Sequence, residues 1–332
     1  MSEQTTTLTR PAPAAAAEPG PRRLTGVLSP VVTPFGADYR PDADRLVRHC
    51  RWLLSNNVGL AVFGTNSEGN SLSVAERMEL LDRLIEAGID PDRLLPGTGC
   101  CALSDSVRLS AYAVKRGCAG VLMLPPFYYK GVSDEGLYRN FAETIEQIGD
   151  ARTRIYLYHI PPVSQVPITI ALIERLLKAY PRQVAGIKDS SGDWNNTQAM
   201  LRAFAGTDFA IFAGSEPFLL ATMRGGGAGC ISATANVNPG PIHALFATWR
   251  DADADAQQAA LDVVRRTFQK YPMIPALKQA IAQWSGDPGW ARLRPPLVEL
   301  GGEQAKSLIA DLKECGFDMP GLREGRAVGQ TR

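Results

Sequence analysis

Residues 155–188 read IYLYHIPPVSQVPITIALIERLLKAYPRQVAGIK. Two short apolar runs, Ile155–Tyr158 and Val184–Ile187, flank a stretch with helical periodicity, Ile168–Ala179. Each run is apolar on both faces, which is typical of strands in a parallel sheet that is covered on both sides. This stretch therefore predicts a strand–helix–strand unit whose helix packs on the outside of the sheet.

The same alternation runs through most of the chain. The apolar runs are Gly26–Val32, Leu60–Phe63, Leu94–Gly97, Gly120–Leu124, Ile155–Tyr158, Val184–Ile187, Ala210–Ala213 and Gly229–Ile231. The helical patterns between them are Ala43–Leu54, Val74–Ala87, Asp105–Lys115, Glu135–Ile148, Ile168–Ala179, Trp194–Phe204 and Pro217–Arg224. Ser73 and Glu76 predict a capping box at the start of one helix, and Ser133 caps another. Eight strand–helix units favour an α/β fold of the (β/α)8 TIM barrel type over an open sheet.

Further helical patterns follow the last apolar run, at Pro239–Arg250, Asp253–Tyr271, Ile274–Trp284 and Gly302–Cys315. This is more helix than a bare barrel needs. We therefore expect a barrel at 24–238 and a C-terminal helical appendage at 239–319. Residues 1–23 are rich in Ala, Pro and Thr, with almost nothing large to bury, and predict a disordered extension. The stretch 320–332 has a similar character and predicts a disordered tail.

Composition excludes several classes of protein. The 332 residues carry 35 basic and 34 acidic side chains, a formal charge of +1, which argues against a nucleic-acid partner bound through a basic face. No segment approaches the ~20 consecutive apolar residues that span a bilayer, so we expect no membrane partner. None of the six cysteines forms a Cys-x-x-Cys pair, and histidine occurs only at 49, 159 and 243. We therefore expect no metal site, reduced thiols and a cytoplasmic location.

Lysine usage points to one position. Only eight of the 35 basic residues are lysine. Those on predicted helices and loops have the character of solvated surface charges, and they are Lys115, Lys130, Lys178, Lys270, Lys278, Lys306 and Lys313. Lys188 instead ends a buried strand, where partial desolvation favours the neutral amine that attacks a ketone to form an imine. The alternative is a structural ion pair between Lys188 and Asp189.

Polar residues follow other predicted strands, at the barrel end where active sites lie. Strand alternation puts Tyr156 and Tyr158 on one side of their strand and His159 on the other. Tyr158 is a candidate proton carrier, Tyr156 fits a barrel-filling aromatic, and His159 fits the core or surface better than a catalytic base. The loop Gly64-Thr-Asn-Ser-Glu-Gly69 brings hydroxyls and backbone N–H groups together in a way that suits a carboxylate.

Three motifs in this order carry a resemblance: Gly64-Thr-Asn-Ser-Glu68, Tyr158-His-Ile-Pro161 and Gly186-Ile-Lys188-Asp189. With them the chain resembles, over roughly residues 24–315, the pyruvate-dependent class I aldolases of the N-acetylneuraminate lyase and dihydrodipicolinate synthase family. The resemblance implies a (β/α)8 barrel with three C-terminal helices that assembles as a homotetramer or homodimer. It also implies that no metal or organic cofactor is needed beyond the covalent imine on the lysine.

Residue roles follow from the same resemblance. Lys188 would form the Schiff base with pyruvate or another 2-oxo acid, Tyr158 would shuttle protons, and Thr65 would pass protons to it. Thr65 and Asn66 would hold the 2-oxo acid carboxylate. Tyr128 would be the tyrosine that one subunit lends across a dimer interface. The resemblance further implies substrate contacts at Ile231, Ser190, Gly214 and Glu216.

The chain departs from the family pattern at positions that concern the substrate. Synthases that use aspartate semialdehyde carry an arginine five residues after the shuttle tyrosine, where this chain has Val163. Valine has no means of making the bidentate contact to a carboxylate. Ser67 replaces a glycine before the loop glutamate, and Pro217 and Ala233 replace polar residues of the neuraminate lyases.

These features favour a catabolic lyase that cleaves or condenses a 2-oxo acid with an aldehyde, of the 4-hydroxy-2-oxo acid or sugar-acid type, or a related dehydratase. Pyruvate would be one half of the substrate. The first alternative is the 4-hydroxy-tetrahydrodipicolinate (dihydrodipicolinate) synthase of lysine biosynthesis. A lesser alternative is a catalytically silent barrel that only binds a 2-oxo acid.

Overall fold

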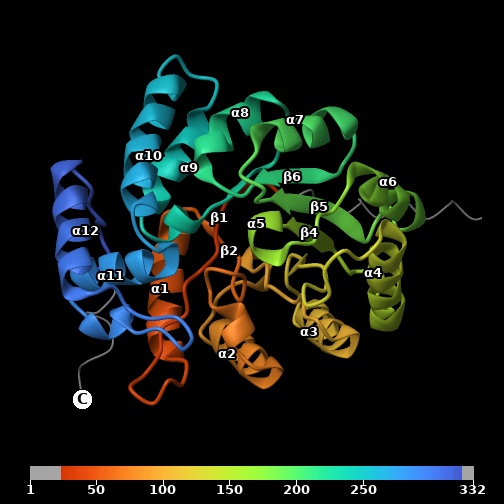
Figure 1. The fold of residues 1–332 in the computed structure, drawn as a ribbon, viewed down its shortest axis with the longest axis horizontal. Coiled ribbons are helices and arrows are strands. Elements are labelled where there is room, and N and C mark those ends of the chain that lie inside the picture. The colour runs from red at the N-terminus through yellow and green to blue at the C-terminus, as the bar shows by residue number, and fades with distance from the viewer. Residues whose placement is uncertain (1–23, 324–332) are drawn as a thin grey trace, which may run out of the picture.

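The computed structural model describes residues 24–323, and within them parallel strands form one curled sheet (Figure 1). The strand order is β2-β1-β7-β6-β5-β4-β3. The strands are β1 (Gly26–Ser29), β2 (Gly59–Leu60), β3 (Val121–Met123), β4 (Ile155–His159), β5 (Val184–Asp189), β6 (Ala210–Ala213) and β7 (Gly229–Ile231). Each lies within or beside a predicted apolar run. One predicted strand, Leu94–Gly97, is absent as a continuous element of this part of the chain.

That segment nevertheless closes the barrel between β2 and β3. Leu95 N donates to Leu60 O at 2.8 Å on one side, and Leu122 N donates to Pro96 O at 2.9 Å on the other. Along this segment every second residue directs its backbone N–H and C=O toward β3. Pro96 is one of these residues, and it has no N–H to donate. One ladder hydrogen bond is therefore missing, and only isolated parallel bridges remain at Leu94 and Gly97. The closed arrangement confirms the predicted TIM barrel.

Helices surround the sheet (Figure 1). They are α1 (Ala43–Ser55), α2 (Val74–Glu86), α3 (Leu103–Lys115), α4 (Asp134–Ile148), α5 (Pro161–Ser164), α6 (Ile170–Ala179), α7 (Trp194–Ala203), α8 (Leu219–Arg224) and α9 (Pro239–Thr248). Both predicted caps are confirmed. The Ser73 hydroxyl accepts from Glu76 N while Glu76 Oε2 accepts from Ser73 N, and the Ser133 hydroxyl accepts from Gly136 N.

The C-terminal helices are α10 (Ala254–Gln269), α11 (Met273–Ser285) and α12 (Gly302–Glu314). α11 and α12 lie beside α1 on one side of the barrel, and α10 lies beside α8 and α9 (Figure 1). α9 packs directly on β1, and its Ile242 and Leu245 share a buried cluster with Val27 and Val58 of the barrel, which Leu261 of α10 also joins. α9 thus completes the ring of barrel helices, and the predicted division after residue 238 stays a prediction.

The predicted extension 1–23 and most of the predicted tail, 324–332, lie outside the described residues. The first residues of that tail are packed against the appendage and α1. Pro320 O accepts a hydrogen bond from Trp52 Nε1 at 2.9 Å, and Arg323 Nε donates to Trp284 O at 2.8 Å. Within residues 24–323, no helix combines the length and the apolar character that crossing a membrane requires.

The barrel interior is filled by apolar side chains around Tyr156. A Cβ atom on Gly120 or Gly186 would lie 2.8 Å from a carbon of the Tyr156 ring, so the two neighbouring strands need glycine there to leave room for the ring. Tyr156 is the barrel-filling aromatic that strand alternation predicts. Because the interior is filled below them, the polar residues at the carboxyl ends of the strands lie at the floor of a cavity and not along a pore.

Candidate active site

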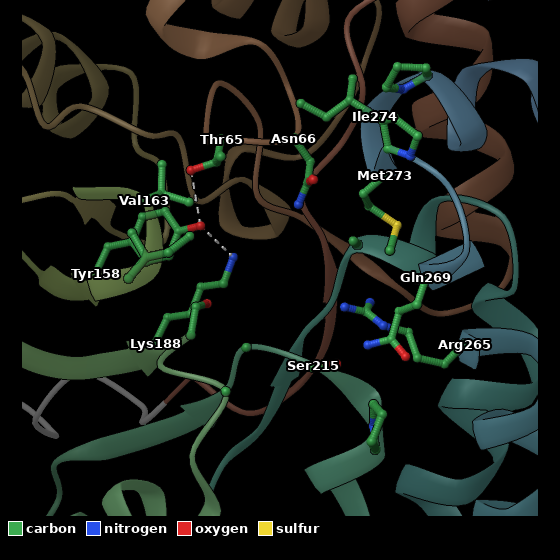
Figure 2. Close-up of a pocket in the computed structure, with 18 of the residues that line it drawn as sticks. Thr65, Asn66, Tyr158, Val163, Lys188, Ser215, Arg265, Gln269, Met273 and Ile274 are labelled. Atoms are coloured by element: carbon green, nitrogen blue, oxygen red, sulfur yellow. Dashed lines mark hydrogen bonds between the residues drawn. The ribbon is translucent and has the colours of Figure 1, made fainter. Parts of the chain in front are cut away.

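Lys188 and Tyr158 lie side by side at the carboxyl ends of adjacent strands. The register of β4 and β5 pairs the two residues, and both side chains are 2% exposed. Lys188 Nζ donates a hydrogen bond to Tyr158 Oη at 3.3 Å, and Tyr158 Oη donates to Thr65 Oγ1 at 3.1 Å. Figure 2 shows this chain of contacts from Lys188 through Tyr158 to Thr65. It joins an amine, a phenol and an alcohol in a line along which protons can move.

The alternative of a Lys188–Asp189 ion pair is wrong. Successive residues of a strand point to opposite faces, so the Asp189 side chain points away from Lys188. Its carboxylate accepts hydrogen bonds from Ser191 N at 3.0 Å, Asn196 Nδ2 at 3.0 Å and Thr197 Oγ1 at 2.6 Å. Asp189 therefore anchors the turn from β5 into α7, and within residues 24–323 the Lys188 amine has the neutral Tyr158 hydroxyl as its hydrogen-bond partner.

His159 lies on the same outer face as Asp189. Its Nδ1 accepts a hydrogen bond from Ile168 N at 2.9 Å, and its Nε2 lies 4.0 Å from Asp189 Oδ1. Burial lowers the pKa of His159, and the nearby Asp189 carboxylate opposes this shift only in part. His159 is thus a buried residue that ties the chain after α5 to the barrel, and it does not face Lys188.

The loop after β2 presents Thr65 and Asn66 to the cavity. Its tight path puts Phe63 and Glu68 at φ of +63° and +54°, in the left-handed region. Gly69 then passes so close to the Phe63 carbonyl that any Cβ would collide with it. Ser67 is buried, and its carbonyl accepts a hydrogen bond from Thr33 Oγ1 at 2.7 Å. The exposed part of the loop therefore consists of small polar side chains beside Lys188.

The opposite side of the floor is formed by the ends of β5 and β6. Gly214 N donates to Asp189 O at 2.7 Å, and a Cβ on Gly214 would lie 2.6 Å from that same oxygen. Glycine is needed there because the two backbones touch. This contact brings Ser190, Gly214 and Ser215 to the cavity wall.

These elements surround a cavity of about 690 Å³. Its far wall comes from the C-terminal helices and the segment before α12. The lining residues from these segments are Arg265, Gln269, Pro272, Met273, Ile274, Pro275, Pro296, Leu297 and Val298. Figure 2 shows Arg265, Gln269, Met273 and Ile274 on the side opposite Lys188. None of these residues is predictable at the site from the sequence, because they follow no strand and because Arg265 is one arginine among many. A strongly helical pattern beyond the last barrel strand is the one signal that pointed to this region.

Lys278 corrects an expectation from the sequence. It was predicted to be a solvated surface charge, but it is completely buried, with Nζ 2.6 Å from Glu68 Oε1. Burial lowers the pKa of Lys278, and the Glu68 carboxylate opposes this shift. Lys278 therefore ties α11 to the loop that carries Thr65 and Asn66.

Comparisons with known proteins agree with this geometry. Residues 23–315 match the dihydrodipicolinate synthetase family. The chain belongs to this family. A relative described as an uncharacterized DapA-like lyase, from Chloroflexus aurantiacus, is 36% identical over 288 residues, covering 86% of this chain and 95% of its own.

Two solved structures are similar throughout. Dihydrodipicolinate synthase from Agrobacterium tumefaciens is 33% identical with a TM-score of 0.81, covering 88% of this chain and 99% of its own. YagE, a prophage protein of the dihydrodipicolinic acid synthase family from Escherichia coli K12 solved in complex with pyruvate, is 26% identical with a TM-score of 0.82 and the same coverage. Membership of the dihydrodipicolinate synthetase family makes this protein a pyruvate-dependent lyase of the aldolase type.

The residues that the family resemblance singled out are not all at the cavity surface. Thr65, Asn66, Tyr158, Lys188, Ser190 and Gly214 line the cavity, as do Val163, Pro217 and Ala233. Ile231 and Glu216 are buried and do not line it, and Tyr128 is 73% exposed away from it. The roles assigned to all of these residues stay predictions.

Residues 24–323 contain no group of three or more His, Cys, Asp or Glu side chains that could hold a metal ion.

Proposed function

We propose that Lys188 forms an imine with the ketone of pyruvate or another 2-oxo acid, and that the enzyme cleaves or forms the C3–C4 bond to an aldehyde. The observation that supports this most is the Lys188–Tyr158–Thr65 chain on the floor of the cavity. It places a buried amine against a phenol that can give and take a proton.

The first step is imine formation. The Lys188 nitrogen attacks C2 of the 2-oxo acid, and the ketone oxygen takes a proton to give a carbinolamine. Loss of that oxygen as water leaves the iminium, and Tyr158 supplies the proton for the departing water. Thr65 and Asn66 lie where hydroxyl and amide groups can hold the carboxylate of the 2-oxo acid.

The second step is the aldol reaction. The iminium withdraws electrons from C3, so cleavage of C3–C4 leaves an enamine instead of a free carbanion. The C4 oxygen loses its proton to Tyr158 as the aldehyde forms, and in condensation the same proton returns to that oxygen. In cleavage, C3 of the enamine then takes up the proton that Tyr158 carries, which restores the iminium, and water hydrolyses this iminium to free pyruvate and Lys188. In condensation, C3 of the pyruvate iminium first loses a proton to give the enamine. The covalent imine is the electron sink, so the proposed cycle needs no metal or organic cofactor.

For the substrate we propose a 4-hydroxy-2-oxo acid or a sugar acid. The enzyme would then be a catabolic lyase or a related dehydratase. Val163 lines the cavity from α5 without a charge, at the position where the family's synthases carry an arginine. Tyr128 is exposed on a single chain, which supports the proposal that it completes the site of a second subunit in a homodimer or homotetramer. A relative from Methanococcoides burtonii described as a 4-hydroxy-tetrahydrodipicolinate synthase, 31% identical over 299 residues, keeps the synthase as the second candidate.

Trapping tests the imine directly. Incubation with pyruvate followed by borohydride should add the mass of the reduced adduct to the peptide that contains Lys188. The Lys188→Arg variant, which keeps the charge but has no neutral amine to offer, should give no adduct and no turnover. Wild-type protein that stays unmodified at Lys188 under saturating pyruvate would overturn the proposal. Condensation of pyruvate with aspartate semialdehyde, compared with other aldehydes, separates the synthase from the catabolic lyase.

A further inference from the structure

Arg265 of α10 reaches the catalytic cavity with nearly all its donors unused. Its side chain is 14% exposed and lines the cavity. Among the contacts of residues 24–323, one acceptor is found for its guanidinium, Glu216 Oε2, at 3.5 Å from Nη1. Nε of Arg265 is buried and has no hydrogen-bond acceptor among the described residues. A guanidinium carries five N–H donors; with the Nε donor buried and one Nη donor in a long hydrogen bond, three Nη donors remain for a ligand.

Glu216 holds Arg265 from behind. Its carboxylate is buried and also accepts hydrogen bonds from the hydroxyls of Ser232 and Thr234. Glu216 thus holds the guanidinium at the far wall, and two hydroxyls fix the Glu216 carboxylate itself. A side chain held in this way loses little conformational freedom when it binds a ligand.

The charges that face the cavity are of one sign. Lys188 and Arg265 are the basic side chains that line it, and the one lining acid, Asp189, is bonded on the outer face of the strand. Figure 2 shows Arg265 and Gln269 on the side of the cavity opposite Lys188 and Tyr158. Apolar side chains also line the cavity, among them Val163 beside Tyr158 and Met273 beside Gln269 (Figure 2).

We propose that Arg265 binds an anionic group, a carboxylate or a phosphate, at the far end of the aldehyde half of the substrate. This rests on the proposed function, in which the other end of the substrate is the 2-oxo acid joined to Lys188. The planar guanidinium matches two oxygens of such a group at once, and the Gln269 amide lies beside it to donate another hydrogen bond. The preferred substrate is then anionic at both ends.

Matched aldehydes test this with pyruvate as the partner. Succinic semialdehyde and butyraldehyde differ in a carboxylate, and glyceraldehyde 3-phosphate and glyceraldehyde differ in a phosphate. For the wild-type enzyme, kcat/KM should be at least 10-fold higher for the anionic member of one pair. The pair that shows this preference tells whether Arg265 binds a carboxylate or a phosphate. Arg265→Gln should reduce that preference by about 10- to 100-fold, mainly through KM. Arg265→Lys should restore it only in part, because lysine lacks the fork.

Arg266→Gln is the matched control. Arg266 is the next residue of α10 and is exposed, so its variant should behave as wild type. If loss of Arg265 leaves Glu216 uncompensated and the protein unstable, the double variant Glu216→Gln, Arg265→Gln removes both charges, and it should show the same loss of preference. An Arg265→Gln enzyme that keeps the wild-type preference for the anionic aldehydes would overturn the proposal, as would a wild-type enzyme without that preference. Borohydride trapping of pyruvate on wild-type Lys188 tests the proposed function separately.

Discussion

Lys278 of α11 and Glu68 of the loop after β2 form an ion pair that is closed off from solvent. Nζ and Oε1 are 2.6 Å apart, and both side chains have no exposed surface. Glu68 Oε2 also accepts a hydrogen bond from Arg294 N at 3.0 Å. The pair joins residues 210 positions apart in the chain, and it fixes the catalytic loop to the C-terminal helices.

Breaking this pair should destabilise the protein strongly. Lys278→Met leaves Glu68 charged and buried without its partner, which costs about 3–5 kcal/mol. We expect thermal unfolding roughly 5–10 °C below wild type, together with lower turnover because Thr65 and Asn66 lose their support. The double variant Lys278→Met, Glu68→Gln should recover part of the stability. Lys306→Met is the control, because Lys306 pairs with Glu303 on the surface and should not change the unfolding temperature measurably.

Tyr158→Phe should separate imine formation from turnover. The ring still packs in the barrel, but no hydroxyl remains between Lys188 and Thr65. We expect pyruvate to be trapped on Lys188 still, but more slowly, because water must then supply the proton for dehydration, and kcat to be lower by about 10²- to 10³-fold. Rapid-quench and steady-state measurements on the same preparation give both quantities. Tyr180→Phe, which removes a surface hydroxyl that donates to Glu146, should leave kcat unchanged. Normal turnover in Tyr158→Phe would show that Tyr158 is not the shuttle.

Mixing two inactive variants tests the role of Tyr128. If Tyr128 of one subunit completes the site of another, Lys188→Ala and Tyr128→Phe subunits are each inactive or weak on their own. A mixed dimer then holds one site with Lys188 from the second variant and Tyr128 from the first. Activity should therefore return after the subunits are unfolded and refolded together, up to half the wild-type value per mixed dimer. No gain above the sum of the separate activities would contradict the shared site.

Glu76 should make stability depend on pH in acid. The hydrogen bonds from Arg294, at 2.7 Å and 3.0 Å, hold the pKa of Glu76 at about 2, below its usual 4.5, and the capping contact with Ser73 adds to this. Because the folded carboxyl binds its proton less readily than the unfolded one, its contribution is complete above about pH 4.5. The contribution is lost as the pH falls toward 2.

The variant Glu76→Gln should therefore cost about 1–2 kcal/mol of the free energy of unfolding at pH 7, a value reduced for partial exposure. The difference from wild type should shrink as urea unfolding is repeated at lower pH. A difference that stays constant between pH 7 and pH 3 would show that the effect is not ionic. Glu303→Gln, at an exposed pair, should show no such dependence.

Much of the barrel is predictable because its signals are local. A short run that is apolar on both faces identifies a buried parallel strand, and Ser73 and Ser133 identify two helix starts by residue type and spacing. Strand alternation also separates Tyr158 from His159 and Lys188 from Asp189, so the inward-facing pair can be picked from the sequence. The strand at Leu94–Gly97 was predicted as a continuous run, but Pro96 removes a hydrogen bond that only the neighbouring strand reveals.

What the sequence by itself determined is the barrel, the strand ends and the lysine placed at one of them, because each depends on a period of a few residues. The tertiary structure alone decided what the C-terminal helices do. A helical period says which residues share a face, but not what that face covers. Lys278 is buried and Arg265 reaches the cavity because α10 and α11 fold back over loops far earlier in the chain. The charge environment of the site is therefore a property of the packed molecule, since it depends on contacts between segments about 50 to 210 residues apart.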